Sequence, residues 1–219
     1  TGIKANTKTS TSPATMALGG NTLTLGSGVF TSADIGKFIV VAGAGPSSAT
    51  GQLMSVPVTS AGSYTVAPTT ATVSGSPTTP ASIQILTALQ GPTINASGSG
   101  ACTNGTYVAS VTGGTFFRQA RVNVTVSGGN LTSISLSDAG AYTVAPSLTG
   151  AVLSGLGSCT ATANFSGLGV YKVLVMQPGA GYALAGTTVS LSGGTGTPAT
   201  LGTPVVKPSQ SSLASTITG

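Results

Sequence analysis

The chain has 219 residues, only 4% of them charged, and its net charge of +5 comes from seven Lys and Arg residues against two acids. Soluble domains usually carry about 25% charged residues, so Ser, Thr and backbone groups must make up most of this surface. The basic residues form no cluster and no run of about 18 apolar residues occurs, which argues against nucleic-acid binding and membrane insertion.

The first 75 residues divide into two parts. Residues 1–20 are polar and lack alternation, which predicts an extended N-terminal arm. Residues 21–75 predict an N-terminal β module that includes a strand over Phe38–Val41. This module ends near the sequence AGSYTVAP, residues 61–68, whose glycine is expected to bend the chain.

Residues 76–100 predict a Pro/Gly-rich linker. Pro77, Pro80 and Pro92 surround one short apolar run, Ile83–Leu86. Because proline and glycine interrupt the pattern at both ends, this segment is expected to separate two domains.

Residues 101–200 predict a β-hairpin repeat domain. Val122, Val124 and Val126 alternate with polar residues, residues 127–130 supply a turn, and a second alternating run follows it. This is the pattern of two half-buried strands joined as a hairpin.

A second hairpin is expected about 40 residues later. Residues 159–165 alternate again, residues 166–169 (Ser-Gly-Leu-Gly) have the composition of a turn, and residues 170–175 form the predicted return strand. Tyr142 and Tyr182 stand at similar places after the two hairpins.

The bend that follows a hairpin occurs in three copies. Residues 61–68 and 139–146 are identical at seven of eight positions, and residues 179–182 (GAGY) give a looser third copy. Glycine is expected there for its positive φ, and proline to end the ladder. Each tyrosine is expected to close the hairpin edge and bond its hydroxyl to backbone, the alternative being a row of carbohydrate-stacking rings. The third copy has Ala180 at the aligned place and offers Gly181 instead. The expected bend residues are Gly62, Tyr64, Pro68, Gly140, Tyr142, Pro146, Gly181 and Tyr182.

Two cysteines, Cys102 and Cys159, each follow a Gly-rich turn. Matching positions in neighbouring units would bring them together as a disulfide, and the alternative is two small buried apolar side chains. Two thiols without any histidine do not make a four-ligand zinc site.

One basic and aromatic group stands out, formed by Phe116, Phe117, Arg118 and Arg121. It is either a patch that faces a partner or an ordinary strand start.

The residues for catalysis are scarce. Asp34 and Asp138 are the two carboxylates of the whole chain, and it has no glutamate or histidine. Glycoside hydrolysis normally needs two carboxylates about 5–10 Å apart, and both aspartates stand in turn-like sequence. The sequence therefore predicts no catalytic residue, no metal site and no cofactor.

Residues 201–219 contain two further prolines and predict a C-terminal arm. The expected fold is all-β, with repeated antiparallel hairpins arranged as a sandwich or a stack and with extended terminal arms.

Two parts of the sequence resemble bacteriophage virion surface proteins. Residues 29–45, VFTSADIGKFIVVAGAG, look like a segment common near the start of tail-fibre and tailspike-like proteins. The alternating hairpin and the bends at residues 61–68, 139–146 and 179–182 are similar to the Gly/Thr-rich repeats of phage fibres, whose bends have the pattern "GxGYTxAP", although residues 183–186 depart from that pattern.

The resemblance implies a non-enzymatic structural protein at the surface of a phage particle. It would be a tail-fibre or spike component, with a capsid decoration protein or a bacterial extracellular adhesin or filament subunit as the alternatives. Hairpins with Gly-rich faces of low charge leave edges and apolar stripes that one copy covers poorly, which predicts a homotrimer or a larger symmetric assembly. The other expected partners are virion proteins and a host surface glycan.

Overall fold

A computed structural model describes residues 15–16, 23–24, 50–98 and 102–208. Every strand pairing in these residues is antiparallel, so the all-β prediction is confirmed. The strands are β1 (Thr15–Met16), β2 (Leu23–Thr24), β3 (Thr50–Ser55), β4 (Val58–Ser60), β5 (Ser63–Val66), β6 (Thr70–Val73), β7 (Ser82–Ala96), β8 (Gly105–Val111), β9 (Thr115–Arg118), β10 (Arg121–Ser127), β11 (Asn130–Asp138), β12 (Ala141–Val144), β13 (Ala151–Ser154), β14 (Ala161–Gln177), β15 (Tyr182–Ala183), β16 (Val189–Ser192), β17 (Thr195–Thr197), β18 (Thr200–Leu201) and β19 (Val205–Pro208).

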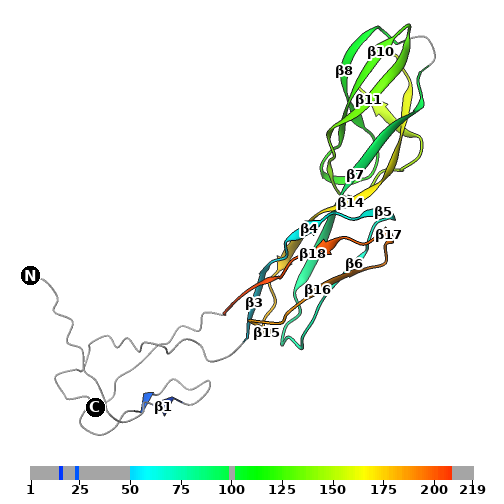
Figure 1. The fold of residues 1–219 in the computed structure, drawn as a ribbon. Helices are drawn as coiled ribbons and strands as arrows, with labels where there is room; N and C mark the ends of the chain where they lie inside the picture. Colours follow the sequence, from blue (N-terminus) through cyan, green and yellow to red (C-terminus); the bar gives the residue numbers. More distant parts are fainter. Residues whose placement is uncertain (1–14, 17–22, 25–49, 99–101, 209–219) are drawn as a thin grey trace, which may run out of the picture.

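Two long strands, β7 and β14, form the spine of the molecule. They pair antiparallel from Ser82 opposite Gln177 to Ala96 opposite Thr162, and they run through both lobes of the body (Figure 1). The expected linker over residues 76–100 is therefore wrong, since most of it is β7. Pro92 is tolerated because β12 pairs with β7 only at Thr87, which leaves that side of β7 without a ladder at the proline.

The second hairpin expected over residues 159–175 is also wrong, because residues 161–175 belong to the single strand β14. The glycines that suggested a turn serve close approach instead. A Cβ at Gly167 would lie 2.9 Å from the carbonyl oxygen of Tyr64, and one at Gly169 would lie 2.6 Å from the side-chain Nε2 of Gln90. Glycine at these positions gives room for β5, which pairs antiparallel with β14 at Leu168.

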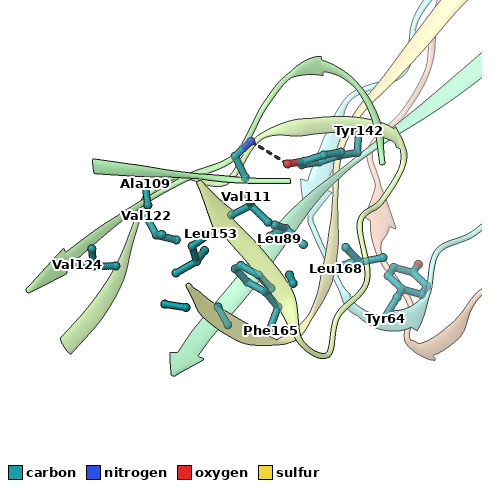
Figure 2. Packing of buried hydrophobic residues seen from close by; sticks show 14 of the residues in the cluster. Tyr64, Leu89, Ala109, Val111, Val122, Val124, Tyr142, Leu153, Phe165 and Leu168 are labelled. Carbon is teal, nitrogen blue, oxygen red and sulfur yellow. Dashed lines mark hydrogen bonds between the residues drawn. The ribbon is translucent and has the colours of Figure 1, made fainter. Parts of the chain in front are cut away.

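The tip lobe consists of β8 to β13 with the adjoining ends of β7 and β14. Its curled sheet has the order β11-β10-β8-β13-β14-β7-β12-β9, and β11 lies against β7 (Figure 1). The predicted hairpin β10–β11 is confirmed, and Val122, Val124 and Val126 are buried. Figure 2 shows Val122 and Val124 packed with Leu153 and other apolar side chains in the core of this lobe.

The basal lobe consists of β3 to β6 and β15 to β19 with the other ends of β7 and β14. It contains three small sheets, β15-β3-β19, β16-β6 and β18-β4, and β5 joins β14 to β17. The C-terminal arm expected from residue 201 is wrong as far as residue 208, because Val205–Pro208 pairs with β3. Residues 209–219 lie outside the described residues.

Most of the expected N-terminal arm and the strand over residues 38–41 also lie outside the described residues. So does the fibre-like segment 29–45. Thr15–Met16 pairs with Leu23–Thr24.

Both ends of the described body leave from the same place. Gly51 and Pro208 are register partners at the end of the basal lobe, whereas the tip lobe lies at the opposite end of the rod (Figure 1). The body therefore has a base, through which the chain enters and leaves, and a tip that carries no chain end.

A disulfide joins the two loops at the tip. Cys102 lies between β7 and β8, Cys159 lies between β13 and β14, and their Cα atoms are 4.5 Å apart. The predicted pairing is confirmed. The bridge links the chain leaving one spine strand to the chain entering the other.

Candidate functional site

The three bend tyrosines are buried, with 4%, 0% and 1% of Tyr64, Tyr142 and Tyr182 exposed. Each hydroxyl oxygen accepts a hydrogen bond from the backbone N–H of an alanine. Ala199 donates to Tyr64 across 2.6 Å, Ala120 to Tyr142 across 2.8 Å and Ala81 to Tyr182 across 2.6 Å. Figure 2 shows the bond from Ala120 to Tyr142. The predicted backbone bonding is confirmed, and buried rings are not available for carbohydrate stacking.

Each of the three alanines directly precedes the first strand of a two-stranded antiparallel ribbon, and the three ribbons are equivalent. In each ribbon, the residue after the alanine is the register partner of the last residue before the bend. These pairs are Arg121 with Asp138, Ser82 with Gln177 and Thr200 with Ser60. We call the alanine, its ribbon, the bend and the tyrosine a tyrosine-closed unit.

The bend of each unit also bonds to a neighbouring strand in the same way. The carbonyls of Ala61, Ala139 and Pro178 accept hydrogen bonds from Val170, Leu89 and Leu53 respectively. In every case the donor stands two residues beyond the register partner of the tyrosine, which is Leu168, Thr87 or Gly51. The three bends are therefore one structural motif.

The bend glycines are Gly62, Gly140 and Gly179, with φ of 66°, 78° and 61°. A Cβ at these positions would lie 2.6, 2.9 and 2.7 Å from the amide nitrogen of the unit's alanine. The expectation that Gly181 fills this role is a misalignment, because the third bend is one residue longer. Gly181 has φ of 90° but faces Thr78.

The prolines Pro68 and Pro146 are buried and follow the ends of β5 and β12 by two residues. Gly194 and Gly114, which directly precede the partner strands β17 and β9, give them room. A Cβ at Gly194 would lie 3.0 Å from the nitrogen of Pro68, and one at Gly114 would lie 2.8 Å from the nitrogen of Pro146.

The alanine donors were missed from the sequence, although a signal existed. The tripeptide Thr-Pro-Ala occurs at residues 79–81 and again at residues 197–199. In the remaining unit Gln119 replaces the proline before Ala120. The tyrosine lies 135, 22 or 101 residues from its alanine, so no fixed spacing links the two.

Asp138, the carboxylate within the described residues, is held by its neighbours. It accepts a hydrogen bond from Gly140 N across 2.8 Å and pairs with Arg118, whose Nε lies 2.9 Å from Oδ2. These contacts fix the bend before Tyr142. No group of three metal-ligating side chains occurs in the described part of the chain, and no helix there is long and apolar enough to cross a membrane.

Phe116, Phe117 and Arg118 lie together on β9, an edge strand that pairs only with β12 among the described strands. Phe117 is 65% exposed, whereas the ring of Phe116 meets that of Tyr142 edge-on at 5.8 Å. Arg118 places its guanidinium carbon 5.2 Å from the centre of the Tyr171 ring. A side-chain hydrogen bond to Tyr171 is the main cause that raises the pKa of Arg118, and Asp138 adds to it.

Arg121 completes the predicted patch. It is exposed and stands opposite Asp138 in the register of β10 and β11. The structure therefore brings the four predicted residues to one region, and it adds Asp138 and Tyr171, which the sequence did not indicate. We call Phe116, Phe117, Arg118, Arg121, Asp138, Tyr171 and the neighbouring Lys172 the waist patch.

Comparison of the chain with protein-family models, with curated proteins and with solved structures gave no match.

Proposed function

We propose that the chain is a non-enzymatic structural protein of a phage particle, a tail-fibre or spike component that projects from its attachment point. The observation that carries this proposal is the pairing of Gly51 with Pro208. A rod whose two chain connections share one end is suited to attachment through its base, with the other end exposed.

The bonding of the rod supports a mechanical role. Three buried tyrosines tie distant strands together, and the disulfide closes the tip. Backbone hydrogen bonds and a covalent bridge hold the shape without the charged surface that soluble domains usually have.

The proposed partners are further copies of the chain, as a homotrimer, and other virion proteins at the base. Large apolar side chains that are exposed in the basal lobe support such contacts, since contact with another subunit would remove them from water. They are Met54, Val66, Met176, Leu184 and Val205.

Labelling tests the location. Antibodies against the tip lobe, residues 102–160, would be applied to particle preparations that contain the chain and viewed by negative-stain electron microscopy. Label on fibres or spikes is expected. Label over the capsid shell would instead support a decoration protein, and label on the bacterial surface without particles would support an adhesin; either result would contradict the fibre assignment.

A further inference from the structure

The charged residues of the described chain are concentrated at one place. Five charged side chains occur in it, and four of them, Arg118, Arg121, Asp138 and Lys172, belong to the waist patch. The fifth, Lys207, lies on β19 at the base. On a surface otherwise made of Ser, Thr and backbone groups, this grouping is the main electrostatic feature.

Contacts and strand register link four members of the waist patch in one row. The Tyr171 ring lies under the guanidinium of Arg118, Arg118 pairs with Asp138, and Asp138 stands opposite Arg121. Three basic groups against one carboxylate leave the patch positive. Arg121 is exposed and makes no ion pair with any of the described residues, so its donors are open to a ligand.

A β-bulge aims the aromatic side of the patch outward. The register of β14 on β7 shifts between Val170 and Lys172, so Tyr171 has no partner of its own. Val170 and Val173 are buried, whereas Tyr171 and Lys172 between them are both exposed. The bulge thus turns an aromatic ring and an ammonium to solvent side by side, as bulges do where a side chain must be re-aimed.

We propose that the waist patch binds an acidic saccharide, a polymer whose sugar rings carry carboxylates. Exposed rings offer flat apolar faces to the C–H faces of sugars. The Arg121 fork suits a carboxylate, and the Lys172 ammonium adds a point charge. The choice of a saccharide over another anion rests on the proposed function, because a projecting module meets the polymers of a cell surface.

Affinity electrophoresis of the full chain tests this inference with three probes cast into the gel. Polygalacturonate is expected to retard the protein, whereas dextran, which has sugar rings without charge, is expected to leave it unaffected. Polyglutamate, which has carboxylates without sugar rings, should retard it much less. Retardation by polyglutamate equal to that by polygalacturonate would overturn the proposal in favour of an acidic polypeptide, and no retardation by polygalacturonate would overturn it outright.

Variants localise the binding. Lys172→Gln and Arg121→Gln are each expected to weaken binding of polygalacturonate by about tenfold, the effect of one charge-assisted hydrogen bond. Lys207→Gln removes the same charge at the base and is the matched control. Tyr171→Ala should also weaken binding, whereas Val152→Ala, which shortens another exposed side chain, should not.

Equal losses in Lys172→Gln and Lys207→Gln would overturn the assignment to the waist patch, because they would indicate attraction by net charge alone. The binding assay and the labelling of particles can fail independently. A chain found on fibres that does not bind polygalacturonate would retain the proposed function and lose this inference.

Discussion

The Tyr64 hydroxyl accepts a hydrogen bond from Ala199 N across 2.6 Å although 135 residues separate them in the chain. The bond joins Tyr64 on β5 to the short segment between β17 and β18. The basal lobe is therefore closed by the same device that closes a short hairpin at Tyr142.

Replacing Tyr64 by Phe should weaken this closure. The N–H of Ala199 would lose its acceptor, so we expect about 1 kcal/mol of destabilisation. Hydrogen exchange should rise in residues 200–208 and 58–60 and stay unchanged in the tip lobe. Tyr107→Phe is the control, because that hydroxyl donates to the Thr103 carbonyl in the tip lobe. If both variants loosened the same residues, Tyr64 would not close the base.

Alanine substitutions at two glycines with nearly equal φ distinguish the cost of backbone strain from the cost of steric crowding. Gly128 and Gly179 have φ of 60° and 61°, but a Cβ at Gly128 meets no atom within 4 Å, whereas one at Gly179 lies 2.7 Å from Ala81 N. Gly128→Ala should cost about 1 kcal/mol. Gly179→Ala should cost about 2 kcal/mol more in denaturant unfolding because of overpacking. Equal costs would refute the assignment of Gly179 to the bend motif.

The fold should lose stability at alkaline pH through Tyr142. Burial is the main cause that raises the pKa of this phenol above its ordinary value of 10.0, and Asp138 adds to it, while the hydrogen bond from Ala120 opposes it. Because the folded state favours the protonated form, the stabilisation is complete below about pH 10 and is lost as pH rises through the folded pKa.

Unfolding free energies of the wild type and Tyr142→Phe between pH 8 and 12 would measure this effect. The wild type should be the more stable below about pH 10, since Phe leaves the buried Ala120 N–H unpaired. Its advantage should shrink above that pH. A constant difference over the whole range would show that Tyr142 does not contribute to alkaline unfolding.

Removing the disulfide should destabilise the tip more than the base. The bridge closes a loop of 57 residues, worth about 4 kcal/mol in the chain-entropy model. The double variant Cys102→Ser with Cys159→Ser should lose most of that stability, and hydrogen exchange should rise first near residues 105–111 and 151–154. Faster exchange confined to the basal lobe would contradict this view of the bridge.

The isolated protein should assemble, as a homotrimer or a larger symmetric oligomer. Light scattering should give a multiple of the 20.9 kDa chain mass, and Met176→Lys should lower it by placing a charge among exposed apolar side chains of the basal lobe. Val152→Lys, in the tip lobe, is the control. A monodisperse monomer at micromolar concentration would contradict the prediction.

Local chemistry made part of the fold predictable. Alternation of Val122, Val124 and Val126 fixes one hairpin, and the repeated AG-x-Y sequence fixes two of the three bends. The cysteine pairing followed from matching positions after turns.

Contacts between distant segments explain the errors. Gly167 and Gly169 read as a turn, yet they are small because a Cβ at Gly167 would meet the backbone of Tyr64 on β5 and one at Gly169 would meet Ala61 and the Gln90 side chain. Pro92 reads as a linker residue, yet it stands where β7 has no ladder on one side. Likewise, the part of the waist patch within residues 116–121 could be predicted because those residues are close in sequence. Tyr171 could not, because it lies on the spine strand β14 and reaches Arg118 only in the folded chain.

The tyrosine-closed unit constrains one end of its ribbon and leaves the other end open. In one unit the open end is the tight turn at residues 127–130, in the next it holds the whole tip lobe, and in the last it leads through Gly51 and Pro208 out of the body. Any insert whose two ends lie side by side fits there. Such a chain lengthens by nesting one module inside the hairpin of another, and growth separates alanine from tyrosine in sequence while their bond stays the same.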